Sequence, residues 1–112
     1  MSVAGDPVSR AFVAVYTTFP DLETAKSVVN GLVKKRIAAC GNIFRIYSIY
    51  RWRGKIEKSP EYGALIKTRK NNYRALERYI KKNHPYEVPE IIAWNLELGQ
   101  KDYLSWITEA TR

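Results

Sequence analysis

The sequence contains few of the residues that usually carry catalysis or bind metals, with one cysteine and one histidine among its 112 residues. A single cysteine excludes an internal disulfide. The chain also has no multi-cysteine box, no glycine-rich phosphate loop and no paired-carboxylate signature. It therefore gives no support for a cofactor enzyme or for a closed structural zinc site within one chain.

Long apolar runs are missing too, and no stretch approaches the length of a membrane span. Residues 1–10 lack the apolar segment of a signal peptide. With no disulfide either, we expect an intracellular, cytoplasmic protein without a membrane partner. The length suits one domain, so we expect a short extension over residues 1–10 and a single domain over residues 11–112.

Acidic residues are the minority charge, with 11 Asp and Glu against 19 Lys and Arg and a net charge of +8. Such an excess is typical of proteins that bind nucleic acids. However, the basic side of the second predicted helix is partly balanced by Glu77, and the aromatic residues are mixed with isoleucine instead of forming an open stacking face. We expect no nucleic-acid partner, although salt-sensitive binding of RNA would revive that alternative.

The apolar pattern predicts four strands and three helices, in the order βαββαβ followed by a C-terminal helix. The predicted elements are a strand over 11–17, a helix over 21–36 capped by Asp21, a long hairpin over 42–69 that reverses at 53–55, a helix from 71 that ends before Pro85, a strand over 91–98, and a short closing helix whose aromatic residues between 103 and 110 pack down. Right-handed crossovers make this order an antiparallel sheet with both helices on one face, the ferredoxin-like arrangement of the α+β class.

The first arm of the predicted hairpin has apolar residues in both registers. One register carries Phe44, Ile46, Tyr50 and Trp52, and the other carries Ile43, Tyr47 and Ile49. A domain this small has few elements left to cover both faces, and Tyr and Trp are residues that anchor interfaces. We therefore expect a homo-oligomer. The alternative is a strong twist that buries both faces within one chain.

The segment His84-Pro85-Tyr86-Glu87-Val88-Pro89-Glu90 combines the only histidine with two prolines and two carboxylates. It is the one place where a divalent metal would find nitrogen and oxygen ligands close in sequence, with His84 and Glu90 as candidate contacts. Six extended residues span on the order of 20 Å, so the segment must curl, or subunits must share the ion. Alternatively, His84 caps the last carbonyls of the preceding helix, and Glu90 pairs with a surface cation.

Cys40 stands among small residues, in the run Ala38-Ala39-Cys40-Gly41. Such a run suits a close-packed strand entry, so we expect a buried structural thiol. The setting is neither open nor electropositive, so we expect no nucleophile and base pair between Cys40 and His84. We accordingly predict a protein that is not an enzyme and has no catalytic residues.

Six motifs follow one another along the chain. They are YTTFPD at 16–21, RIAACGNI at 36–43, YRWRGK at 50–55, KT at 67–68, HPYEVPE at 84–90 and YLSW at 103–106. In this order they resemble the CutA divalent-cation tolerance family over about residues 11–110. The resemblance implies a ferredoxin-like protomer, a tight cytoplasmic homotrimer built from the long hairpins, and a role in tolerance to copper and other divalent metals.

The resemblance also implies a set of metal contacts. The ligands proposed for the family correspond here to His84 and Glu90, with Tyr16 at the position where the family has a cysteine. A phenol with an ordinary pKa near 10 stays protonated at neutral pH, so Tyr16 is a poor substitute for a thiolate. The alternative function is a trimeric scaffold or signalling module, similar in architecture to the PII proteins, that binds a small ligand or a partner protein between subunits.

Overall fold

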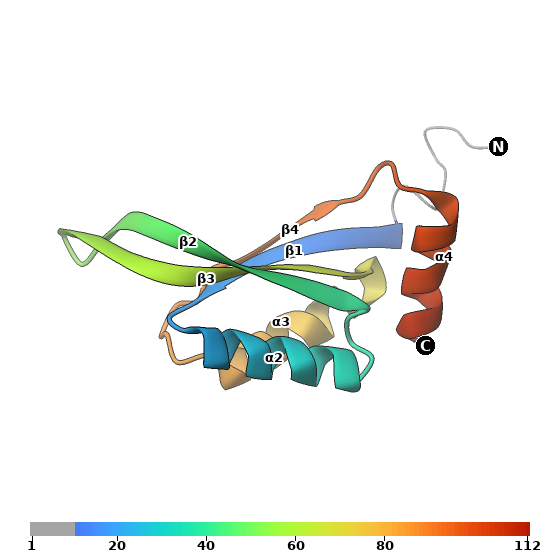
Figure 1. Cartoon of the computed structure of the whole chain (residues 1–112), viewed down its shortest axis with the longest axis horizontal. Coiled ribbons are helices and arrows are strands. Elements are labelled where there is room, and N and C mark those ends of the chain that lie inside the picture. The colour runs from blue at the N-terminus through green and yellow to red at the C-terminus, as the bar shows by residue number, and fades with distance from the viewer. Residues whose placement is uncertain (1–10) are drawn as a thin grey trace.

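A computed structural model describes residues 11–112, so the extension predicted over residues 1–10 lies outside the described residues. The described chain forms a four-stranded antiparallel sheet in the order β2-β3-β1-β4, with α2 and α3 on one face (Figure 1). The elements are β1 (Phe12–Phe19), α2 (Leu22–Lys34), β2 (Cys40–Trp52), β3 (Lys55–Arg69), the 3₁₀ turn η1 (Lys70–Asn72), α3 (Tyr73–Asn83), β4 (Ile91–Asn95) and α4 (Lys101–Ala110). The ferredoxin-like prediction is therefore confirmed.

β1 is the central strand that its continuous apolar run predicts, and all but one of its residues are buried. It pairs with β3 on one side and with β4 on the other. Its odd-numbered apolar residues pack against α2 and α3, because side chains alternate between the two faces of a strand. That core contains Val13, Val15, Phe19, Ala25, Val28, Val29, Leu32, Ala38, Ala64, Ile66, Leu76 and Ile80.

The helices on this face begin close to where the sequence predicts. The side chain of Asp21 accepts a 2.8 Å hydrogen bond from the backbone N–H of Thr24 and so caps α2. The second helix differs slightly, because Asn72 makes no cap and a single 3₁₀ turn precedes α3. No helix of residues 11–112 has the length and apolarity needed to cross a bilayer.

The β2–β3 hairpin is the most extended part of the molecule and projects well beyond the helices (Figure 1). Its reversal is a two-residue turn in which Arg53 (φ 52°) and Gly54 (φ 80°) both take the left-handed conformation. This is the geometry that matches the twist of the two strands. The predicted reversal at 53–55 is confirmed.

β4 ends three residues earlier than the predicted 91–98. The backbone N–H of Leu96 still donates a 2.9 Å hydrogen bond to the carbonyl of Phe12, which is the first residue of β1. Beyond Leu96, β1 offers no further partner, so the ladder stops and the chain leads into α4.

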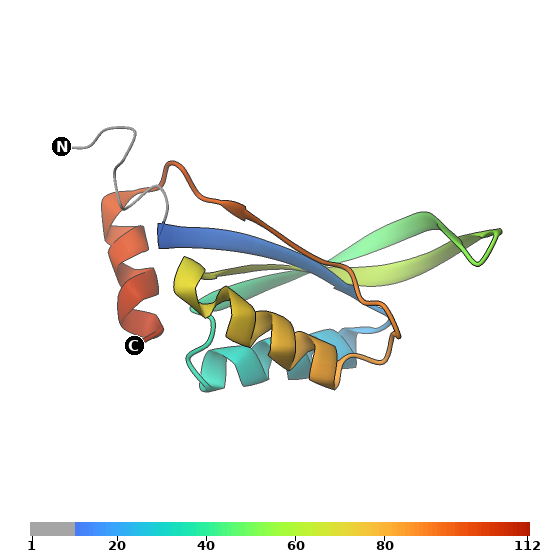
Figure 2. The same ribbon diagram turned by 180° about the vertical axis from the view of Figure 1, so that it is seen from behind.

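α4 stands at the end of the sheet opposite the hairpin tip, as Figure 2 shows from behind. The prediction that its aromatic residues pack down is wrong. Leu104 and Ile107 are buried, in a second cluster with Phe12 and Ala39, whereas Tyr103 and Trp106 are 40% and 43% exposed. The helix is turned so that its aliphatic side, not its aromatic side, faces the protomer.

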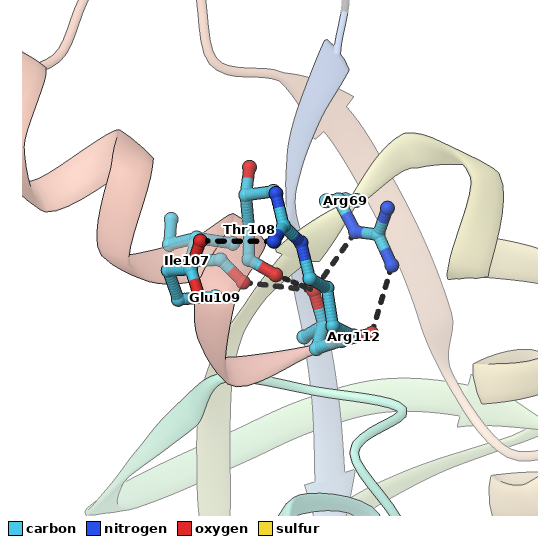
Figure 3. Close-up of polar contacts among 6 residues, drawn as sticks. Arg69, Ile107, Thr108, Glu109 and Arg112 are labelled. Carbon is cyan, nitrogen blue, oxygen red and sulfur yellow. Dashed lines mark hydrogen bonds and ion pairs between the residues drawn. The ribbon is translucent and has the colours of Figure 1, made fainter.

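The C-terminal turn is fixed to the sheet by Arg69 of β3 (Figure 3). Its Nε donates to Thr111 Oγ1 at 2.9 Å, and its Nη2 donates to the Thr111 carbonyl at 2.8 Å. The same hydroxyl donates to the Ile107 carbonyl at 2.8 Å. These bonds hold α4 in place, so its orientation is a defined feature of the fold.

Candidate functional site

A cleft of about 750 Å³ lies between the hairpin and the segment that follows α3. We call it the hairpin cleft. It is lined by Thr18 of β1, by Tyr47, Ser48, Ile49, Tyr50, Trp52, Arg53 and Glu61 of the hairpin, and by Pro85, Tyr86, Glu87, Val88 and Glu90. Its volume lies in the range of small-molecule sites, and most of the predicted motif at 84–90 borders it.

The end of α3 positions the segment at 84–90. Pro85 cannot continue the helix, and His84 before it adopts an extended backbone with φ −99° and ψ 138°. The side chain of Asn83 donates a 2.9 Å hydrogen bond to the Tyr79 carbonyl at the helix end. Asn83 therefore takes the capping role that one sequence alternative gave to His84, and that alternative is wrong.

His84 instead ties the segment to the end of β1. Its Nε2 donates to the Thr18 carbonyl at 2.7 Å, and its Nδ1 accepts from the backbone N–H of Tyr86 at 3.1 Å. Its ring stacks on Phe19, with 4.9 Å between centroids. Because Nδ1 accepts, the ring is the neutral tautomer with its proton on Nε2, and both nitrogens are engaged within the protomer.

Of the three proposed ligand positions, Glu90 lines the cleft, whereas His84 and Tyr16 do not. Burial raises the pKa of Tyr16, and the negative charges of Glu90 and Glu61 raise it further. The Tyr16 phenol thus stays protonated at neutral pH, which makes it a poorer metal ligand still. Glu90 is thus close enough to Tyr16 for its charge to act on the phenol, while both ring nitrogens of His84 are bonded to other groups.

Glu61 is the site residue that the sequence reasoning missed. It is only 4% exposed, and its Oε2 accepts a short hydrogen bond from the Tyr86 hydroxyl. Burial and this bond to Glu61 together hold the pKa of Tyr86 far above its usual value. The register of the hairpin strands could have indicated this residue. It places Glu61 on the same face of β3 as Gly63, and these two residues pair with Ile46 and Phe44 of β2.

The mouth of the cleft is bridged by an ion pair between the hairpin and the segment. Arg53 Nη2 lies 2.8 Å from Glu87 Oε1, and both side chains are about 70% exposed, at 72% and 70%. The Arg53 guanidinium also lies over the Trp52 ring, 5.4 Å from its centroid. An exposed pair of this kind contributes little to stability, but it places an aromatic face and a carboxylate around one cation.

Cys40 does not line this cleft. Its sulfur lies 3.3 Å from the hydroxyl of Tyr103 in α4. Burial and the bond to Cys40 raise the pKa of Tyr103 to about 12. The thiol is half-buried rather than fully buried as predicted, because it begins an edge strand. Cys40 and His84 have separate partners, so they form no nucleophile and base pair.

The residues of one protomer do not form a complete metal site as they stand. No group of three or more His, Cys, Asp or Glu residues within 11–112 could together hold an ion. Both nitrogens of His84 are occupied, and the phenol of Tyr16 is protonated. An ion bound here would need either a rearranged segment or ligands from another subunit.

The hairpin leaves much of its apolar surface open to solvent. Its exposed apolar side chains are Phe44 (41%), Tyr47 (65%), Ile49 (64%), Tyr50 (41%), Trp52 (39%) and Ile56 (52%). The alternative in which twist buries both faces within one chain is therefore wrong. Contiguous exposed apolar area of this kind marks an interaction surface.

Comparisons with known proteins agree on one family. The family model described as CutA1 divalent ion tolerance protein matches residues 13–110. A relative from Pyrococcus horikoshii, called divalent-cation tolerance protein CutA, is 45% identical over 100 residues, covering 89% of this chain and 98% of the relative. The crystal structure of CutA1 from that organism superposes with a TM-score of 0.86 over 89% of this chain and 98% of its own.

A second solved structure bears on localisation. The CutA protein of Archaeoglobus fulgidus is 38% identical to this chain and superposes with a TM-score of 0.89, covering 90% of this chain and 99% of its own. That relative is described as periplasmic. Close similarity within the family therefore does not fix one compartment.

Proposed function

The chain belongs to the CutA1 divalent ion tolerance family, and from this we propose that it serves divalent-cation tolerance as a cytoplasmic, non-enzymatic homotrimer that binds Cu²⁺ or another divalent ion. The observation that carries the proposal is the family match across residues 13–110. It includes the hairpin, the cleft and the segment at 84–90, so the parts on which the function depends lie within the matched region.

The exposed hairpin supports the assembly. Tyr47 and Ile49 are 65% and 64% exposed, and they pair with Pro60 and Lys58 in the hairpin. The hairpin extends away from the body (Figure 1). Burying apolar area contributes roughly 25 cal/mol per Å², and aromatic residues anchor such contacts. Packing the ribbons of several copies against one another removes this surface from water.

His84 and Glu90 are the proposed metal contacts. Glu90 lines the cleft and has no ion-pair partner among residues 11–112, so its oxygens are available to an ion. Binding through His84 requires Nδ1 to exchange the Tyr86 N–H for the metal. Since one protomer supplies too few ligands, the remaining ligands in this proposal come from a second subunit.

Calorimetric titration of Cu(II) into the wild type, His84→Ala and Glu90→Gln tests the metal site. Each variant should weaken binding by at least about tenfold, because ligand sets lose much of their affinity with one member. Glu97→Gln, an exposed carboxylate outside the cleft, is the matched control and should bind as the wild type does. Equal binding by all four proteins would remove both residues from the site.

A second candidate function is a trimeric scaffold that binds a small ligand. The hairpin cleft favours it, because its volume of about 750 Å³ and its mixed aromatic and polar lining exceed what a bare ion needs. An ion and an organic molecule are distinguished by their dependence on a chelator, since only metal binding is abolished by it.

A further inference from the structure

The solvent-exposed side of α3 is almost entirely cationic. Its exposed residues are four cations and one uncharged amide. They are Arg74, Arg78, Lys81, Lys82 and Asn83. Lys70, in the 3₁₀ turn just before the helix, is exposed as well. Figure 2 shows α3, in yellow to orange, on the outer side of the helical layer.

Four of these cations follow one line along the helix. Lys70, Arg74, Arg78 and Lys82 stand four residues apart, and we call these four residues the cationic row. Side chains at this spacing share one face of a helix, about 6 Å apart along its axis. Like charges four residues apart destabilise a helix, and Arg74 lies in the first turn, where the macrodipole disfavours a cation. The stability of the helix therefore does not explain the row.

The cationic row is not neutralised within residues 11–112. The only carboxylate of α3 is that of Glu77, and one of its oxygens lies 3.4 Å from Arg74 Nη1. Its other oxygen accepts a 3.3 Å hydrogen bond from the Tyr73 hydroxyl. The Arg74 side chain is still 79% exposed, and the other three members of the row have no ion pair within residues 11–112.

The cationic row stays accessible when the hairpins pack together. None of its members belongs to the hairpin or lines the hairpin cleft. It lies on the helical layer, which covers one face of the sheet while the hairpin projects beyond it (Figure 1). An assembly through the hairpins thus presents one such row for each copy of the chain.

The surroundings of the row favour a protein partner over a nucleic acid or a membrane. No aromatic side chain of α2 or α3 is among the exposed large hydrophobic residues, so the helical layer offers no ring on which bases stack. The exposed residues of α3 include no apolar side chain that would insert into a bilayer. A helix with a carboxylate at every fourth position, in contrast, repeats its charge at the same spacing as the row, and ion pairs between helices set partner choice.

We propose that the cationic row docks an acidic helix of a partner protein, whose carboxylates at four-residue spacing face the four cations. The guanidinium groups of Arg74 and Arg78 suit bidentate pairing with carboxylates. Exposed ion pairs are individually weak, so the affinity comes from several pairs in register and from several rows in one assembly. This docking goes beyond metal and small-ligand binding and depends on neither.

The test uses the full chain, with EDTA present, and fluorescent peptides built on an alanine-rich helix. One peptide carries glutamate at every fourth position, and a permuted peptide carries the same glutamates spread around all sides of the helix. We expect the first peptide to bind about three- to fivefold more tightly by fluorescence anisotropy, because only its carboxylates align with the row. Binding should be lost at about 1 M salt, where the Debye length is about 3 Å.

Two further anions separate the classes of partner. A single-stranded oligonucleotide with the net charge of the peptide and vesicles that contain phosphatidylserine are titrated under the same conditions. We expect both to bind more weakly than the first peptide.

Variants locate the docking site. Arg78→Glu reverses the charge in the middle of the row and should fold, because it places opposite charges four residues from Arg74 and Lys82. It should weaken binding of the first peptide by at least about tenfold, because like charges then face each other. Arg78→Gln only removes the charge and should weaken binding by about two- to fivefold. Lys101→Glu makes the same charge reversal at an exposed position of α4 and should keep the wild-type affinity.

Four results would overturn the proposal: no binding of the first peptide, equal binding of the two peptides, tighter binding of the oligonucleotide or the vesicles, or wild-type affinity in Arg78→Glu. The Cu(II) titration without chelator reports on the metal proposal separately, so failure of one proposal leaves the other readable.

Discussion

His84 and Thr18 are joined by a hydrogen bond of 2.7 Å between Nε2 and the carbonyl oxygen, across 66 positions of sequence. The bond ties the segment after α3 to the end of the central strand. Because Tyr86 follows two residues later and contacts both the His84 ring and Glu61, this single bond helps to position the floor of the hairpin cleft.

The first prediction concerns this connection. His84→Ala removes two hydrogen bonds and the ring that stacks on Phe19, and we expect the free energy of unfolding to fall by about 1–3 kcal/mol. Lys82→Ala, at an exposed position of the same helix end, is the control and should change stability little. Urea unfolding at one fixed protein concentration measures both. A loss no larger than that of the control would show that His84 has no structural role.

The second prediction concerns Tyr86 at neutral pH. Tyr86→Phe keeps the ring but removes the donor to the buried Glu61, so we expect a loss of about 1–3 kcal/mol at pH 7 because a buried acceptor is left unsatisfied. Tyr73→Phe, whose hydroxyl bonds the less buried Glu77 at 3.3 Å, should cost less. Equal losses in the two variants would argue against a special role for Glu61.

The third prediction is the pH dependence of the same hydroxyl. Burial and the bond to Glu61 raise the folded-state pKa of Tyr86 above its ordinary value of 10.0, so its contribution to stability is complete below pH 10 and declines as pH rises above that value. Tyr86→Phe should therefore lose less stability than the wild type as the pH rises above 10.0. Parallel pH profiles of the two proteins would contradict this.

The fourth prediction concerns the open hairpin surface. Ile49→Lys replaces a side chain that is 64% exposed, so the protomer should fold, but the charge should prevent the ribbons from packing together. We expect the melting temperature of the wild type to rise with protein concentration and that of the variant not to. Val33→Lys, an exposed apolar position of α2 (38%), should keep the wild-type dependence.

The fifth prediction tests the packing beside Tyr16. A methyl group on Gly63 would lie 2.9 Å from a ring carbon of Phe44 and 3.1 Å from one of Tyr16, so both rings must shift. We expect Gly63→Ala to cost about 1–3 kcal/mol, as overpacking does. Ser59→Ala in the same strand is the control, and a neutral Gly63→Ala would mean that the rings move freely.

Much of the fold is predictable from local patterns in the sequence. The apolar run of β1, the Asp21 cap and the reversal at 53–55 depend on neighbouring residues only, and the structure has a central strand, a cap and a reversal at these places. The end of β4 and the side of α4 that faces the protomer differ from the prediction. The end of β4 depends on where β1 begins, and the orientation of α4 depends on the bonds between Arg69 and Thr111.

The candidate site was predictable in outline and not in detail. The two prolines around residues 85–89 correctly indicate a segment that leaves the helix and presents side chains. The partners of those side chains lie far away in sequence, with Glu61 25 positions from Tyr86 and Thr18 66 positions from His84. No local pattern specifies such pairs, and they decide which nitrogens and oxygens are free.

The central claim is that copies of this chain associate through their hairpins and cover the apolar surface there. Sedimentation equilibrium of the wild type at low micromolar concentration tests it most directly. We predict a single species of about 39 kDa, three times the chain mass of 13.0 kDa. A stable species of 13.0 kDa that persists as the concentration is raised would contradict the claim.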